Sequence, residues 1–98
     1  MDTPQPNAPD GPTVLVWSGE VTVSSAAEHH AKLVAAMNAG RGLVINAEGL
    51  CHLDTSALQL LAATRIASER QGTLFRLESV SPSVTETIRL AGLLELLC

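Results

Sequence analysis

The residues best suited to carry chemistry in this chain are Asp54, Thr55 and Ser56, a carboxylate followed by two hydroxyl groups. They lie where an apolar run gives way to a segment rich in strong helix formers, from Ala57 to Arg70. Asp54 is therefore predicted to be the N-cap of a helix, its carboxylate accepting from free backbone N–H groups. The two hydroxyls then fall in the first helical turn, near the positive end of the helix dipole. Because that position favours added negative charge, the chemistry it indicates is phosphorylation.

The segments around this helix alternate between predicted strands and predicted helices. Three short apolar segments are predicted strands: residues 13–17, 43–47 and 73–77. Three segments with helical spacing are predicted helices: residues 25–40, 55–70 and 81–91. Ser25 and Glu28 match a capping box, and Ser81 with Pro82 matches a helix start. This alternation indicates a small α/β domain, for which we expect a mixed sheet of about four strands flanked by three to four helices.

The helix predicted from residue 55 has more apolar surface than one buried stripe requires. Its predicted inner face consists of four side chains: Leu58, Leu61, Ala62 and Ile66. Leu60, Ala63 and Ala67 form a neighbouring stripe, and Ser56 lies on the same stripe one turn before Leu60. This stripe is interpreted either as an apolar patch for a partner beside Ser56 or as packing against another part of the chain. The sequence favours neither interpretation.

The first twelve residues differ in composition from the rest of the chain. They contain four prolines, at positions 4, 6, 9 and 12. Since proline removes a backbone donor, residues 1–12 are predicted to be a disordered arm without a paired central strand. The remaining residues, 13–98, have the length of one small domain with a single modest core.

The segment from Ala47 to Leu58 resembles the centre of a STAS domain, the fold of bacterial anti-sigma factor antagonists. In that family an Asp-Ser-Ser-Gly-Leu type element begins a helix, and its second hydroxyl residue is phosphorylated; Ser56 occupies that place. The resemblance continues in order over residues 13–98, through segments 18–20, 72–77, 81–84 and 91–93. The chain departs from the family pattern in two places. Ala57 replaces the usual glycine, and Val21-Thr22 replace an acidic residue that commonly follows the glycine-acid turn.

The resemblance implies a bacterial regulatory protein that acts in signal transduction and transcription regulation by reversible protein binding. Its partner would be an anti-sigma factor or a related kinase-like protein, and phosphorylation of Ser56 would control the complex. Thr55 is the alternative phosphorylation site. The expected partner surface comprises the hydroxyl motif and the apolar stripe beyond it: Asp54, Thr55, Ser56, Leu60 and Ala63.

Two other roles fit the same residues. The Asp-Thr-x-x-Leu-Gln-Leu-Leu pattern also resembles STAS subunits that sit on the ATPase of bacterial phospholipid transporters, where Thr55 and Leu60 would belong to a permanent interface. A STAS component of a chemosensory or stressosome assembly is the third possibility. The genes beside this one would distinguish the three roles.

Composition and spacing argue against several other classes of function. The net charge of −4 and the scattered basic residues do not suit nucleic acid. His29 and His30 point about 100° apart on a helix, so no metal site is expected. Cys51-His52 lack an orienting group, so we expect neither an enzyme nor a bound cofactor. Direct membrane insertion is not expected, because no apolar run reaches about 18 residues. The two cysteines fit a cytoplasmic protein, and the oligomeric state is left open.

Overall fold

The computed structural model describes residues 11–98. The predicted arm therefore lies outside the described residues, except for Gly11 and Pro12. The elements follow one another along the chain in this order: β1 (Thr13–Val16), β2 (Gly19–Val21), the 3-10 helix η1 (Val23–Ser25), α1 (Ala26–Ala39), β3 (Leu43–Asn46), β4 (Leu50–Leu53), α2 (Thr55–Gln71), β5 (Phe75–Glu78), α3 (Pro82–Leu90) and α4 (Leu94–Leu97). The predicted small α/β domain is confirmed.

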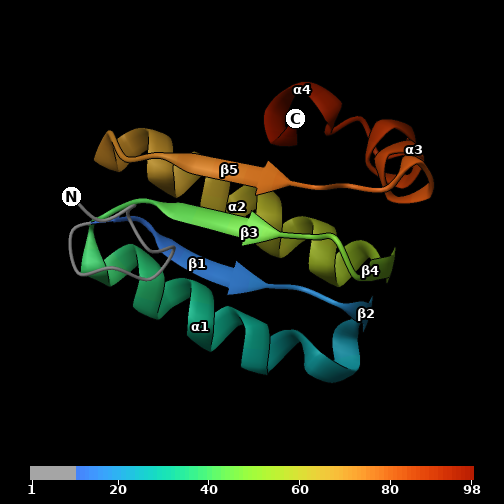
Figure 1. Ribbon diagram of the computed structural model, residues 1–98, viewed down its shortest axis with the longest axis horizontal. Coiled ribbons are helices and arrows are strands. Elements are labelled where there is room, and N and C mark those ends of the chain that lie inside the picture. The colour runs from blue at the N-terminus through green and yellow to red at the C-terminus, as the bar shows by residue number, and fades with distance from the viewer. Residues whose placement is uncertain (1–10) are drawn as a thin grey trace, which may run out of the picture.

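The strands form two parallel sheets instead of the single mixed sheet of about four strands (Figure 1). One sheet has the order β1-β3-β5, with Leu43 aligned to Thr13 on one side and to Phe75 on the other. The other pairs β2 with β4. Gly19 and Glu20, which match the glycine-acid turn of the family pattern, are thus part of a strand. β2 has only three residues, and in β4 only the two end residues, Leu50 and Leu53, are buried, so neither segment shows a clear alternation in the sequence.

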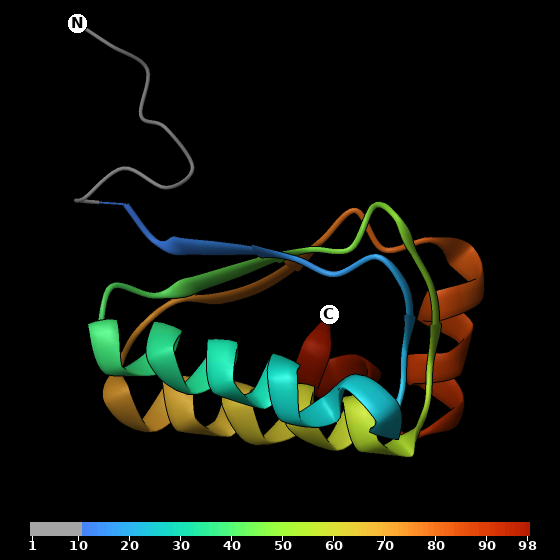
Figure 2. The same ribbon diagram turned by 90° about the horizontal axis from the view of Figure 1, so that it is seen from below.

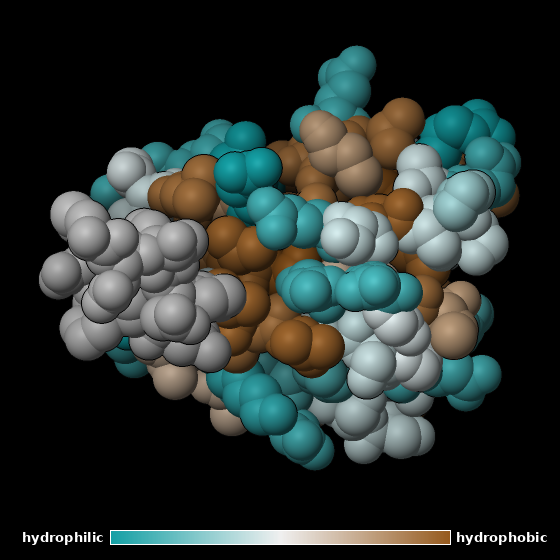
Figure 3. Space-filling model, in the orientation of Figure 1, coloured by the Kyte–Doolittle hydropathy of each residue, from teal (hydrophilic) through white to brown (hydrophobic). Residues whose placement is uncertain are grey.

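Helices α1 and α2 lie on one face of the three-stranded sheet, as Figure 2 shows. Leu43 and Ile45 of the central strand are fully buried in the core, as are Leu61 of α2 and, almost fully, Leu33 of α1. No helix of the described residues covers the opposite face. Hydrophobic side chains gather in the middle of that face (Figure 3). Val16, at the end of β1, is 67% exposed.

The predicted capping box at the start of α1 was wrong. Ser25 is the N-cap residue, but its side chain makes no capping hydrogen bond. Its hydroxyl instead donates to the backbone carbonyl of Thr22, at 3.3 Å, inside the turn of η1. Glu28 pairs with Lys32 at 3.5 Å. The capping box is absent because η1 directly precedes α1 and already engages Ser25.

The inner face of α2 also differs from the prediction. Ile66 is 42% exposed, so its assignment to the core was wrong, whereas Leu58 and Leu61 are buried as expected. Thr64 and Ser68 are buried in its place. The Thr64 hydroxyl donates to the carbonyl of Leu60 and the Ser68 hydroxyl to that of Arg65, both at 2.7 Å. Because the helix itself accepts these hydrogen bonds, burying the two hydroxyls leaves no polar group unpaired.

The third helix begins as predicted. Ser81 is its N-cap, with its hydroxyl accepting from the backbone N–H of Val84 at 3.3 Å, and Pro82 follows. The preceding strand begins at Phe75, two residues later than expected. Ala91, the last residue of the predicted helix, is the C-cap of α3 and is exposed.

The Trp17 side chain, buried at the end of β1, lies against His29 of α1. The two ring centroids are 4.7 Å apart. The His29 Nδ1 atom is buried and has no hydrogen-bond partner among the described residues. Burial lowers the pKa of His29, Glu28 raises it and Lys32 lowers it further, with a net decrease. The neutral imidazole is therefore the form that the folded protein favours.

This packing predicts a pH dependence of stability. Where the His29 pKa is lower in the folded protein, the unfolded chain binds more protons, so the free energy of unfolding should fall as pH drops from about 7 to 5. Urea unfolding across this range should show the decrease. His29→Phe should reduce it, while His30→Gln, on the exposed side of α1, should leave it unchanged. An equal pH dependence in wild type and His29→Phe would contradict the assignment.

Candidate partner-binding site at the start of α2

The Asp54 carboxylate caps α2, as predicted, and also connects it to η1. Its Oδ1 atom accepts from the backbone N–H of Ala57 at 3.1 Å, and its Oδ2 atom accepts from that of Val23 at 2.8 Å. The hydrogen bond from Ala57 lowers the pKa of Asp54 most, with further contributions from Val23 and Ser56. The carboxylate therefore stays ionised and joins two segments that are distant in sequence.

Thr55 and Ser56 occupy the first two positions of α2. Thr55 is exposed and Ser56 is half-buried. Neither hydroxyl makes a hydrogen bond to another described residue. Both therefore remain available to accept a phosphate or to contact a partner.

Ala57 stands where the family pattern has glycine, and it is fully buried. Its methyl group packs into the core, so it does not border the exposed side of Ser56. The substitution thus leaves the surface around the hydroxyl open.

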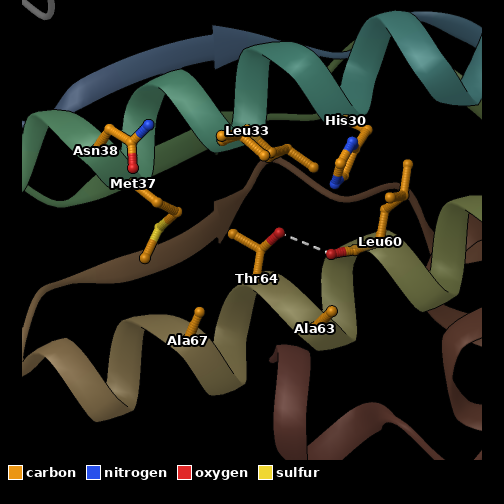
Figure 4. A pocket seen from close by; sticks show the side chains of 9 residues that line it. His30, Leu33, Met37, Asn38, Leu60, Ala63, Thr64 and Ala67 are labelled. Carbon is orange, nitrogen blue, oxygen red and sulfur yellow. Dashed lines mark hydrogen bonds between the residues drawn. The ribbon is translucent and has the colours of Figure 1, made fainter.

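A groove with a volume of about 230 Å³ lies between α1 and α2 (Figure 4). Its walls are mainly apolar, and they are formed by His30, Leu33, Val34, Met37, Asn38, Leu60, Ala63, Thr64 and Ala67. Leu60 and His30 lie on opposite sides of it. The Gln71 side-chain amide donates to the carbonyl of Met37 at 3.2 Å and connects the two helices at their C-terminal ends.

The apolar stripe predicted beyond Ser56 therefore borders this groove. Leu60 is half-buried and packs partly on the core, while Ala63 is exposed. Each of the two interpretations of the stripe thus describes part of its environment. The contribution of α1 was missed, although the helical spacing of His30 and Val34 places them on one side of that helix.

A scan against protein families identifies the chain. The model described as "Mlab, STAS domain" matches residues 5–98. This chain belongs to the STAS domain family. A comparison with curated proteins gives no match. STAS domains generally bind other proteins, in regulatory or transporter-associated roles, and Ser56 of this STAS domain lies in the segment that carried the resemblance.

No helix among residues 11–98 has the length and apolar character needed to cross a membrane. In the same range, no three His, Cys, Asp or Glu side chains gather in a way that could hold a metal ion.

The bridging role of Asp54 predicts the effect of its removal. Asp54→Ala should lower the urea midpoint of unfolding, since the N–H groups of Ala57 and Val23 lose their acceptor. Glu48→Ala is the control, because the Glu48 side chain is exposed and outside the cap. The difference in urea midpoint between wild type and Asp54→Ala should also shrink at acid pH, because the lowered pKa of Asp54 stabilises the fold only while the carboxylate is ionised. An unchanged midpoint for Asp54→Ala would contradict the bridge.

Leu60 and Leu61 allow a direct comparison of groove and core. Leu61 is fully buried, so Leu61→Ala should cost about 2–5 kcal/mol of unfolding free energy. Leu60 is only half-buried, so Leu60→Ala should cost about 1 kcal/mol. Equal losses in urea unfolding would place Leu60 in the core and remove it from the groove wall.

Proposed function

We propose that this STAS domain binds a protein partner through the start of α2 and the adjoining groove, and that phosphorylation of Ser56 controls the complex. One observation carries the proposal: Ser56 lies on the same stripe of α2 as Leu60 and Ala63, one helical turn before the groove wall begins at Leu60. A change of charge at Ser56 therefore occurs beside the apolar surface that a partner would cover.

Phosphate at Ser56 would add about −1.5 to −2 charges at neutral pH. Within the free domain the dipole of α2 offsets part of that charge, so the fold remains intact. In a complex the same charge must lose its hydration, and it stands two residues from the ionised Asp54. Phosphorylation should thus weaken partner binding without unfolding the domain. By resemblance to the antagonists, the partner is an anti-sigma factor or a related kinase-like protein.

The exposure of Thr55 favours a second candidate, in which the domain is a permanent subunit on a transporter ATPase. Thr55 and Leu60 would then lie in a constant interface, and phosphorylation would have no role. Both candidates use the same surface, so they differ only in how the interface responds to charge at Ser56.

The two candidates predict different effects of substitutions at Ser56. Under the switch, Ser56→Ala should keep affinity for an anti-sigma or kinase-like protein encoded beside the gene, and Ser56→Asp should weaken it about tenfold or more. Isothermal titration calorimetry measures both. Ser83→Asp is the matched control, since Ser83 holds the same position at the start of α3. Equal affinity for wild type, Ser56→Asp and enzymatically phosphorylated protein would reject the switch.

A further inference from the structure

One stripe on the outer side of α2 carries almost no charge. Along α2, Ser56, Leu60, Ala63, Ala67 and Arg70 follow one another at intervals of three or four residues and form a single stripe. Arg70 is its only charged residue. The facing side of α1 contributes the uncharged Ala31, Val34, Ala35 and Asn38. Glu28 and Lys32, which border them, pair with each other at 3.5 Å.

The stripe of α2 has opposite chemistry at its two ends. It begins at Ser56, two residues from the ionised Asp54, and it ends at the exposed Arg70. Ala63 lies midway, seven residues from Ser56 and seven from Arg70. The ends are about 21 Å apart at a rise of 1.5 Å per residue.

We propose that a second copy of this chain docks on this face, with the two α2 helices antiparallel and crossing at Ala63. A two-fold axis at Ala63 places Arg70 of each copy over the Asp54–Ser56 end of the other. The guanidinium then meets a carboxylate at both ends of the interface. The antiparallel arrangement also opposes the dipoles of the paired helices. The small Ala63 side chain allows close approach at the crossing point.

The same symmetry explains why Ile66 is exposed. With the two-fold axis at Ala63, a residue some positions after Ala63 in one copy lies opposite the residue the same number of positions before Ala63 in the other. Ile66 of one copy therefore lies opposite Leu60 of the other. Leu60 lines the groove, and Ile66 is 42% exposed in the single chain. The contact buries an apolar side chain that the domain itself leaves in solvent.

The charge distribution favours a second copy at this surface over other surfaces. The chain has a net charge of −4, which opposes self-association in general. On this face, however, Glu69 beside Arg70 already pairs with Arg65 at 3.4 Å, and Arg70 of the other copy arrives at the end of α2 that holds the ionised Asp54. The dimer would cover the groove and so exclude the partner of the proposed function, but it does not depend on that function.

Sedimentation of the full chain without any partner tests the dimer. The wild type should show a concentration-dependent equilibrium between monomer and dimer. Ala63→Glu, which puts two carboxylates at the axis, should raise the dimer dissociation constant about tenfold or more. Ala39→Glu, an exposed alanine at the end of α1 on the side away from α2, is the matched control and should change it little.

Reversing the charges tests the arrangement. Arg70→Glu alone should weaken the dimer, and the double variant Ser56→Lys with Arg70→Glu should restore it. In addition, Ala63→Cys should form a disulfide between copies in a background with Cys51→Ser and Cys98→Ser, whereas Ala39→Cys should not. A monomer at every concentration with no disulfide at position 63, or a dimer indifferent to Ala63→Glu, would overturn the proposal. A monomer that still binds a partner would reject the dimer and leave the proposed function standing.

Discussion

The Asp54 carboxylate accepts backbone hydrogen bonds from α2, which it caps, and from Val23 of η1, which lies 31 positions before it in the sequence. One oxygen closes the first turn of α2, and the other holds Val23 of η1, the turn that leads into α1. The carboxylate thus ties together the starts of the two helices, which the parallel strands place at the same end of the sheet. Ser56, one helical turn before the groove residue Leu60, lies directly beside this shared anchor. An ionised group suits the task because one carboxylate can accept from both elements at once.

The order β1-β3-β5 explains why the helices share one face. Both crossovers advance in the same direction along the sheet, and right-handed connections then place α1 and α2 on the same side. The two helices run parallel to each other and leave the groove between them (Figure 2). The same rule leaves the other face of the sheet without a helix from the described residues. Most parallel sheets are covered on both faces, so the exposed Val16 is a consequence of this small topology.

A partner that binds the α1–α2 layer would contact a shaped, apolar surface with few charges. Leu60 is held partly by the core, which fixes the wall of the groove, while Ala63 leaves room for an approaching element. In such an uncharged setting one added phosphate would be a large perturbation, because few neighbouring charges compensate for it. A switch, a permanent subunit interface and a self-complementary dimer are therefore competing uses of one surface. Changes of charge at positions 56 and 70 distinguish them.

The sequence by itself determined the local features of this protein, because short-range chemistry fixes them. Asp54 and Ser81 begin helices through their own side chains, and Gly40 and Gly72 end helices with the positive φ angles that glycine adopts easily. The tertiary structure alone decided which side of each helix is buried. Thr64 entered the core because its hydroxyl bonds within α2. The pairing of β2 with β4 and the α1 wall of the groove also depended on contacts between distant segments, which no local pattern encodes.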